Sequence, residues 1–595
     1  MFLGHSLLNS VTIINVLQNV LPPGPKDPPG VFNRSLRRYY DYIIVGGGSA
    51  GSVLAARLTE DKTSVLLLEA GGSDLENEAT VIPGASGNLL RTKQDWNYHS
   101  VPQKYSSFAM ENKQIYLASG KMLGGCGSMN SMVVIRGSRH DYDEWAKQGC
   151  KGWSYKEVLP YFKKMETMKI PALSGSPYRG TKGKIVVTPK SSTTLEFFNR
   201  KAASEIGYRS VDCNGYSQIG YCPNQANIKN GERCSSTTCY LRPVMYRRNL
   251  QISLNSYVTK VLIRGKRAIG VQFVKGGRTY NVYARKEVIM SAGAFGSPHI
   301  LLLSGVGPKM HLRKFKIPVH ADLPVGNNLQ NHPILAMPYS INTTLNINVK
   351  KLTDPETVLD YILHRKGYYT TPLLDGHMFD KLDKTSPSKY ADSQDIFFPT
   401  AYERPSIVSS YSNYIDKVQQ ELLKRTTDSS FNVFLVLLHP KSKGYVRLAT
   451  ANPLRQPLLD PRFLANPHDI EMFLKMIRWT QQLEKTSSWR SLDVRLIRYD
   501  MEGHCGELEF NTDNYWRCII RHFIISGCHP SSSCRMGSKR DPTAVVDPTL
   551  RVKGIKNLRV VDASVMRNVI SGNTNSPTMM IAEKAADMIK CGTKY

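Results

Sequence analysis

Three glycines in the pattern G-x-G-x-x-G could bind a phosphate group. Gly46, Gly48 and Gly51 follow directly after the apolar residues 42–45, and residues 52–58 have the Ala/Leu content of a helix. A strand that turns into a helix at such glycines directs backbone N–H groups at an anion, and the missing Cβ atoms let the backbone approach it closely. The pattern therefore predicts a turn that binds a pyrophosphate.

An acidic residue stands where a dinucleotide-binding unit needs a carboxylate. A second apolar run, residues 64–68, ends at Glu69, about 20 residues after the glycines, where a carboxylate can accept hydrogen bonds from ribose hydroxyls. Glycine-rich turns that bind nothing are common, but strand, turn, helix and acid together favour a dinucleotide. This unit alone does not distinguish FAD from NAD.

Two further segments are rich in small residues, which indicates close approach of the backbone to a flat or charged group. The first is residues 120–137. The second follows an apolar strand at residues 287–290, and it contains Ser297-Pro298 as a helix start and Gly305 as a helix stop. We therefore predict a second strand-to-helix turn of the doubly wound α/β type.

The composition sets limits on the partners. The chain has 595 residues, which indicates more than one domain, and 78 Lys and Arg against 48 Asp and Glu give a net charge of +30. Such an excess favours anionic partners or surfaces. The basic residues are scattered, however, and clusters such as 34–38 and 313–316 are short. We interpret them as a solvated basic surface and predict no nucleic-acid partner.

The cysteines predict disulfides rather than a metal site. None of the 11 cysteines forms C-x-x-C, and no H-E-x-x-H occurs, so we predict no metal. The pairs Cys213/Cys222 and Cys234/Cys239 could be disulfides in an oxidising compartment. Asn33-Arg-Ser and Asn342-Thr-Thr are glycosylation acceptors only if the chain is secreted.

The first residues have the pattern of an amphipathic helix. Apolar residues within 1–21 share one helical face but polar residues interrupt them, and a proline-rich linker follows. A cleaved signal peptide is an equal alternative for this leader. No apolar run reaches the length of a membrane span, so we predict none. We expect a secreted protein, with a mitochondrial or cytoplasmic one as the alternative.

Several of these motifs together resemble the glucose–methanol–choline (GMC) flavin oxidoreductases. Residues 120–137 and 293–307 resemble the two signature segments of that family. The sequence is most similar to the arthropod glucose dehydrogenase-like branch, with the choline dehydrogenases next. The resemblance spans about 41–590 and continues through residues 323–332, 444–448, 460–461, 528–530, 560–564 and 571–578.

The resemblance implies FAD as the cofactor. Some relatives bond the flavin covalently through a histidine just before the position of Asn130, but this chain has Met129 there, so we predict non-covalent FAD. The implied contacts are Gly46, Gly48 and Gly51 to the pyrophosphate, Glu69 to the ribose, Val258 to the adenine, Met122, Cys126, Asn130 and Val133 along the ribityl chain and isoalloxazine, and Asp562, Ala563, Asn575 and Thr578 to further parts of the flavin.

His529 matches the catalytic histidine of the family, and Asn573 matches its partner. Oxidising an alcohol to a carbonyl moves a hydride to the flavin and a proton to a base, and a neutral imidazole suits that proton near neutral pH. An amide can hydrogen-bond the substrate oxygen but cannot be the base. Taken alone, His-Pro would be a turn and Gly-Asn-Thr-Asn a loop. We interpret His332, His439 and His522 as structural.

The implied fold is α/β: a doubly wound, Rossmann-like FAD-binding domain plus an α+β substrate domain with an antiparallel sheet. We expect a leader and linker at 1–40, the FAD-binding region at 41–332, the substrate-binding region at 333–520 with the family's C-terminal region starting near residue 435, and a returning segment at 521–595 that carries the catalytic pair.

The implied activity is that of an FAD-dependent dehydrogenase that oxidises a CH–OH donor, a sugar or an alcohol, and passes the electrons to a quinone or another acceptor. An oxidase that uses O2 and a non-catalytic binding protein with the same fold are the alternatives. A nicotinamide enzyme is disfavoured because the C-terminal motifs resemble those of an FAD family. The sequence leaves sugar, choline, aliphatic alcohol and steroid open as substrates.

Overall fold

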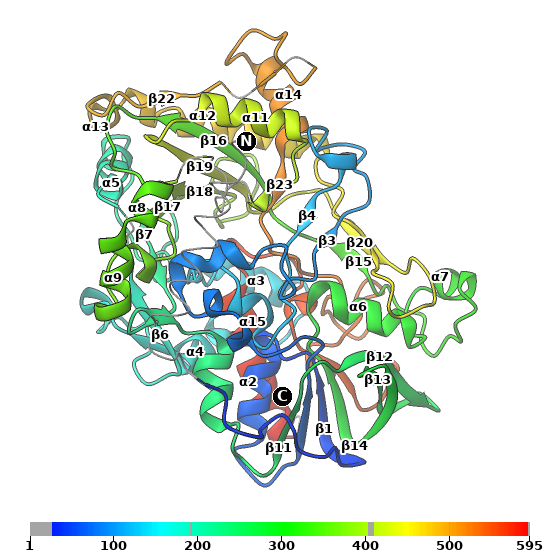
Figure 1. The fold of residues 1–595 in the computed structure, drawn as a ribbon. Helices are drawn as coiled ribbons and strands as arrows, with labels where there is room; N and C mark the ends of the chain where they lie inside the picture. The colour runs from blue at the N-terminus through cyan, green and yellow to red at the C-terminus, as the bar shows by residue number, and fades with distance from the viewer. Residues whose placement is uncertain are drawn as a thin grey trace, which may run out of the picture.

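Two large sheets with helices packed against them dominate the structure (Figure 1). It is a computed structural model that describes residues 26–190, 193–400, 402, 410–498, 500–501 and 503–592. The predicted leader helix at 1–21 lies outside these residues.

The first sheet contains the predicted glycine-rich unit. Its parallel part places Ile43 of the first strand between Val288 on one side and Leu66 on the other. These strands are apolar throughout because helices cover the sheet. The sheet has seven strands in the order β11 (Leu250–Ser253), β2 (Val65–Leu68), β1 (Tyr39–Val45), β14 (Arg278–Met290), β13 (Arg267–Lys275) and β12 (Tyr257–Arg264), and β24 (Leu558–Val560) pairs with β14.

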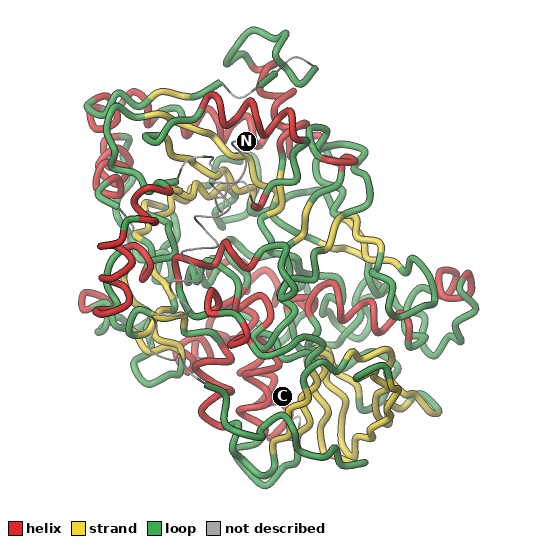
Figure 2. Tube along the Cα trace, in the orientation of Figure 1, coloured by secondary structure: helices red, strands yellow, loops and turns green. Residues whose placement is uncertain are grey.

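Helices from both ends of the chain cover this sheet. Helix α2 (Ser49–Leu58) follows β1 after the glycine turn, and α15 (Asn575–Lys590) packs beside it, to the left of the sheet in Figure 2. Gly46 has a φ of +102°, and a Cβ on Gly51 would overlap the Gly46 carbonyl oxygen, so glycine is needed at both positions. Helix α6 (Gly293–Leu303) follows β14 and confirms the second strand-to-helix turn. The expected helix start at Ser297-Pro298 was wrong, because the helix already begins at Gly293 and Pro298 lies inside it.

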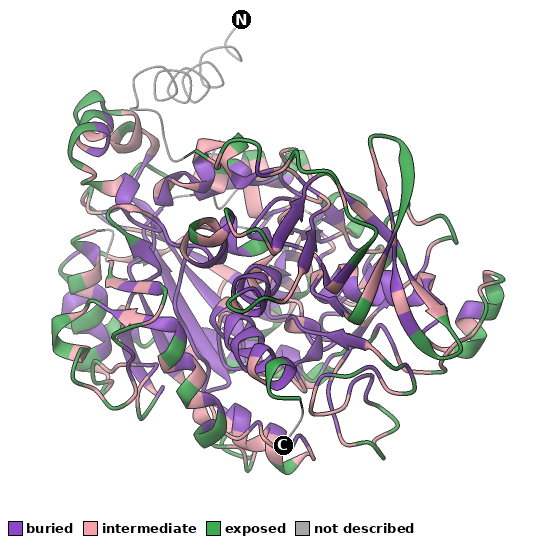
Figure 3. Ribbon diagram, turned by 90° about the horizontal axis from the view of Figure 1, so that it is seen from below, coloured by how far each residue is buried: buried purple, intermediate pink, exposed green. Residues whose placement is uncertain are grey.

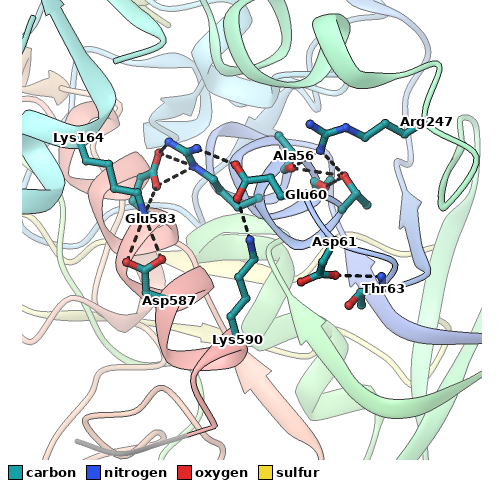
Figure 4. A network of polar contacts seen from close by, with 12 residues as sticks. Ala56, Glu60, Asp61, Thr63, Lys164, Arg247, Glu583, Asp587 and Lys590 are labelled. Carbon is teal, nitrogen blue, oxygen red and sulfur yellow. Dashed lines mark hydrogen bonds and ion pairs between the residues drawn. The ribbon is translucent and has the colours of Figure 1, made fainter. Parts of the chain in front are cut away.

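Buried charges join α2 to α15 in the network shown in Figure 4. The Nε of Arg57 donates to the Glu583 carboxylate at 2.9 Å, and the Glu583 side chain is fully buried. Lys164 also approaches Glu583, at 3.4 Å, and the Tyr240 hydroxyl donates to it at 2.6 Å. At the exposed end of the network, Glu60 accepts from Lys590 at 2.7 Å. Helix α15 is thereby fixed to α2, the first helix of the described residues.

The second sheet is antiparallel and confirms the predicted substrate domain. All eight residues of β19 (Ser430–Leu437) are buried, and α12 (Pro467–Thr480) and α14 (Asp513–Phe523) cover one face of the sheet. Figure 3 shows purple, buried strands beneath helices with green, exposed outer faces. The order is β22 (Arg495–Leu496), β16 (Pro333–Ser340), β19 (Ser430–Leu437), β18 (Ser393–Phe398), β17 (Gly376–Asp380) and β7 (Gly220–Pro223), and β23 (Ile525–Ser526) pairs with β16.

The edge strand β7 comes from the stretch expected to bind FAD, so the N-terminal region contributes one strand to the second sheet. The expected domain boundaries themselves stay predictions.

The smaller sheets are β15 (Asn327–Leu329) with β20 (Gly444–Arg447) and β21 (Leu458–Asp460), β5 (Glu166–Met168) with β6 (Ile185–Pro189) and β8 (Gln225–Ala226), β3 (Tyr98–His99) with β4 (Tyr116–Leu117), and β9 (Ile228–Lys229) with β10 (Glu232–Arg233). The remaining α-helices of the described residues are α3 (Arg139–Lys147), α4 (Tyr155–Met165), α5 (Leu195–Glu205), α7 (Lys309–Lys314), α8 (Val349–Thr353), α9 (Pro355–His364), α11 (Asp416–Arg425) and α13 (Ser487–Arg490).

Disulfides close three short loops. The predicted pairs Cys213–Cys222 and Cys234–Cys239 are both bonded. A third disulfide, Cys505–Cys518, was not predicted because its partners are 13 residues apart and no spacing rule links them. His522 lies 3.6 Å from each sulfur of this third bridge, and these three residues form a group with metal-ligand geometry in which both thiols are already bonded.

Candidate active site

A cavity of about 300 Å³ connects the two sheets. On one side lie Val45, Leu68 and Ser291, at the carboxyl ends of the parallel strands or just beyond them. On the other side lie Ile396 of β18 and Phe434 of β19. Ligands of doubly wound proteins bind at this edge of the sheet, so the cavity is where a dinucleotide would be expected.

The first turns of three helices reach this cavity. Ser49 and Ala50 of α2, Gly293 of α6, and Asn575 and Thr578 of α15 all line it, as do Gly46 and Gly48 of the glycine turn. The first N–H groups of a helix lack partners within the helix and carry a partial positive charge. Three such helix starts around one cavity favour an anionic group such as a pyrophosphate.

Glu69 is anchored by backbone groups at the same end. The N–H of Gly47 donates to one carboxylate oxygen and the N–H of Gly71 to the other, each at 2.8 Å. Glu69 is buried and lines the cavity, and burial raises its pKa to about 7 despite these two hydrogen bonds. Each carboxylate oxygen has a second lone pair with which to accept a ribose hydroxyl.

The segment 120–133 forms one wall of the cavity. Cys126, Asn130 and Val133 line it, whereas Met122 does not and instead packs in an apolar cluster. Arg233, which sequence reasoning missed, is buried and donates to both the carbonyl and the side-chain oxygen of Asn130, at 2.6 and 2.9 Å. A lone arginine carries no motif that could have indicated this role. Arg233 thereby fixes the backbone of the wall.

Residues of the C-terminal segment complete the cavity. The Asp562 carboxylate accepts from the N–H groups of Gly293 and Ser564, at 2.9 and 2.8 Å, so it joins the two neighbouring turns. Asn575 accepts from the Ser49 hydroxyl at 2.7 Å, which links α15 to the glycine turn. Of the other expected FAD contacts, Val258, Ala563 and Thr578 line the cavity, and Gly51 packs behind it.

His529 and Asn573 meet at the second-sheet end of the cavity. The His529 Nε2 lies 3.0 Å from the Asn573 amide nitrogen, and burial lowers the pKa of His529 to about 4. Within the described residues, the Asn573 Oδ1 is buried and has no hydrogen-bond partner. A ring that stays neutral beside a free amide oxygen can take up a proton and orient a hydroxyl group.

Two residues before β16 hold the His529 ring. The Asn331 side-chain oxygen accepts from the His529 backbone N–H at 2.8 Å, and the His332 Nδ1 lies 3.0 Å from the His529 Nδ1. Our interpretation of His332 as structural omitted this contact, although the residue falls in the segment 323–332 that carries the family resemblance. The His439 Nε2 lies 2.8 Å from the hydroxyl of Ser571, and Ser571 precedes Asn573 by two residues.

The fold and the cavity define a doubly wound α/β protein with a dinucleotide-type site between two sheets. Comparison with known proteins makes this more specific, because the GMC oxidoreductase family matches with its N-terminal part at residues 40–334 and its C-terminal part at residues 440–582. The glucose dehydrogenase [FAD, quinone] of Drosophila melanogaster is 36% identical over 562 residues, which cover 93% of this chain and 87% of that protein. The mitochondrial choline dehydrogenase of Homo sapiens is also 36% identical, over 93% of this chain and 90% of that protein.

Solved structures agree with the fold. A variant of formate oxidase from Aspergillus oryzae RIB40 superposes with a TM-score of 0.81 at 25% identity, over 94% of this chain and all of that one. An FAD-dependent oxidoreductase from Chaetomium thermophilum gives a TM-score of 0.77 at 28% identity, over 93% and 99% of the two chains.

This chain therefore belongs to the GMC oxidoreductases and is an FAD-dependent enzyme that acts on CH–OH donors. The cavity fits FAD, since three helix starts surround the place of a pyrophosphate, Glu69 can bind a ribose, and Met129 offers no nitrogen for a covalent bond. Among the described helices, none combines the length and the apolar character needed to cross a membrane.

Proposed function

We propose that the enzyme is a dehydrogenase in which His529 is the base, with a quinone-type compound as electron acceptor. The observation that carries this proposal is the half-buried His529 ring, whose lowered pKa favours the neutral form, with Asn573 on one nitrogen and His332 on the other. FAD, when bound, would supply the hydride acceptor. The protein positions the carbinol carbon and takes the hydroxyl proton.

The proton arrangement follows from the two ring contacts. Two Nδ1 atoms 3.0 Å apart form a hydrogen bond only if one carries a proton. An amide nitrogen only donates, so the Asn573 contact uses the Nε2 lone pair of His529, and this requires that the His529 Nδ1–H donates to His332. The base requires the same tautomer, with the substrate hydroxyl displacing the Asn573 N–H from Nε2. The substrate hydroxyl then donates to Nε2, and the Asn573 amide N–H stabilises the developing negative charge on the oxygen.

The remaining expected residues take roles in holding FAD. Under this proposal Gly46 and Gly48 bind the pyrophosphate, Glu69 binds the adenosine ribose, and Val258 lies at the adenine. Gly51 supports the glycine turn from behind, and Met122 supports the flavin wall through packing. The flavin-side contacts are Cys126, Asn130, Val133, Asp562, Ala563, Asn575 and Thr578.

The choice of a quinone-type acceptor draws on the similarity to the Drosophila glucose dehydrogenase [FAD, quinone], and an oxidase that uses O2 is the second candidate. Steady-state turnover with one alcohol should be compared in air-saturated buffer and under argon with a quinone-type dye. A dehydrogenase gives faster turnover with the dye, with little hydrogen peroxide in air. Stoichiometric peroxide at an equal or faster rate in air would instead establish an oxidase.

We also propose that the protein matures in an oxidising compartment. The support is the three disulfides of the described residues, since such bonds are rare in reducing compartments. Thiol titration of the denatured, secreted protein should leave these six cysteines unreactive until a reductant is added. Reactive thiols at Cys213 and Cys222 before reduction would contradict the proposal.

A further inference from the structure

The end of the cavity beyond His529 and Asn573 is apolar. It is lined by Ile334 of β16, Ile396 and Phe398 of β18, Phe434 of β19, Ile525 of β23 and Leu374. All six are buried and at most 7% exposed. The flavin-binding end has the opposite character, with glycines, helix starts and Glu69.

The register of the second sheet explains why these side chains point into the cavity together. Ile396 lies opposite Phe434, and Ile525 lies opposite Ile334. Ile396 and Phe398 are two residues apart on one strand and therefore share a face. The intervening Phe397 is also buried but points to the other face and does not line the cavity. The apolar lining is thus a property of one face of the sheet.

Charged groups are absent from this end in the part of the chain that the structure describes. The only carboxylates among the described lining residues are Glu69 and Asp562, and backbone N–H groups occupy both of them. No Lys or Arg of the described residues lines the cavity. His529 and Asn573 converge on the reacting position, and the uncharged side chains of Tyr411, Ser526 and Cys528 also line the cavity.

This lining discriminates between the open classes of donor. A sugar would bury several hydroxyls against aliphatic and phenyl groups, and each hydroxyl left without a partner costs binding energy. A quaternary ammonium would need a carboxylate or free aromatic faces. Phe398 and Phe434 stack on each other, with centroids 5.1 Å apart, so each offers the cavity at most one face, and no carboxylate stands beside them or beside Tyr411 among the described lining residues. The net charge of +30 further disfavours a cation.

We propose that the physiological donor is an alcohol with an uncharged, apolar body, which lies against the second sheet while its hydroxyl meets His529 and Asn573. This inference deepens the proposed function and rests on it. The body is aromatic or branched aliphatic, because flat phenyl groups and branched side chains of Ile and Leu form the lining.

Anaerobic reduction of the purified holoenzyme tests the proposal. The donors are straight-chain primary alcohols of increasing length, a benzylic alcohol, glucose and choline. The rate at which the visible flavin absorbance is lost is measured at several donor concentrations, and its slope against concentration gives a second-order rate constant for each donor. We expect this second-order rate constant to rise by about 10-fold or more for an added methylene while the pocket fills. Glucose and choline should be the poorest donors.

The outcomes distinguish a failure of the apolar-donor inference from a failure of the proposed alcohol-oxidising function. If glucose or choline reduces the flavin faster than every apolar alcohol, the inference is wrong and the alcohol-oxidising function stands. If no donor reduces the flavin although dithionite does, the proposed function itself fails.

A matched pair of variants tests the lining directly. Phe398→Leu should lower the rate constant for the benzylic alcohol by about 10-fold, as expected for lost contacts in an apolar pocket, with FAD content unchanged. Phe397→Leu removes the same atoms from the opposite face of the same strand and should change the rate constant less than 2-fold, roughly the scatter between preparations, while lowering the melting temperature. Equal effects of the two variants on the benzylic alcohol would overturn the assignment of this face as the substrate surface.

Discussion

At the scale of single residues, chemistry depends on what the neighbours do to an ordinary side chain. His529 is a histidine before a proline, and its sequence context alone predicts no more than a turn. Its burial and its contact with His332, 197 residues away in sequence, make it a neutral ring with one oriented lone pair. The family resemblance predicts His529 and Asn573 as the catalytic pair, and this stays a prediction. It could not indicate the His332 contact, because that contact arises only when β16 and β23 pair.

The lowered pKa of His529 predicts a specific pH profile. The base is active when neutral, and in the folded enzyme the protonated fraction grows only as the pH falls toward about 4. The acid limb of kcat/KM should therefore lie well below the usual histidine pKa of about 6.5. The same shift lowers the free energy of unfolding as the pH falls from about 6.5 toward 4, because the unfolded chain takes up the proton first. A profile of kcat/KM with an acid limb near 6.5 would contradict this burial effect.

At the scale of elements, the strands and helix starts of the first sheet were predictable from local patterns. Apolar runs followed by glycines gave β1, β2 and β14, and the small residues gave the turns into α2 and α6. The pairing of β7 with β17 was not predictable, since a four-residue strand carries too little pattern to identify its partner. The contact of α15 with α2 likewise depends on charges 526 residues apart in sequence.

The buried charge network between these helices predicts unequal costs for two similar substitutions. Glu583→Ala leaves Arg57 without its buried partner, and breaking a buried ion pair costs about 3–5 kcal/mol. Glu60→Ala removes a partly exposed partner of the same arginine and should cost about 1 kcal/mol or less. Denaturant unfolding of both holoenzymes measures the difference. Equal losses of stability would mean that the Arg57–Glu583 pair does not fix α15.

At the scale of the whole molecule, the cavity joins distant parts of the chain. Gly46 and Glu69 belong to the N-terminal part of the chain, His529 and Thr578 belong to the C-terminal part, and Phe434 belongs to the second sheet. The family resemblance made this convergence predictable in outline. The apolar lining at the second-sheet end of the cavity could not be predicted without the register of that sheet. Strands that are buried on both faces do not reveal in sequence which face meets a substrate.

Because FAD would contact both ends of the chain, its removal should destabilise the entire fold. A ligand at 1,000 times its dissociation constant adds about 4 kcal/mol to the stability of the form that binds it. Calorimetry of the apoenzyme with and without added FAD should show a higher melting temperature with FAD, increasing with FAD concentration. A melting temperature independent of FAD, with FAD still bound, would mean that FAD binds the folded and the unfolded chain equally well, and this would contradict a site that exists only in the folded chain.

In the proposed function, His529 removes the hydroxyl proton while bound FAD accepts the hydride. The direct measurement is the rate of anaerobic flavin reduction by a good alcohol donor, in the wild-type holoenzyme and in His529→Ala with equal FAD content. We expect the rate of flavin reduction to be about 10²–10⁴-fold lower in the variant, which is the usual contribution of general base catalysis. An exposed-histidine variant, His364→Ala, should match the wild type. A His529→Ala enzyme that reduces its flavin at the wild-type rate would contradict the account.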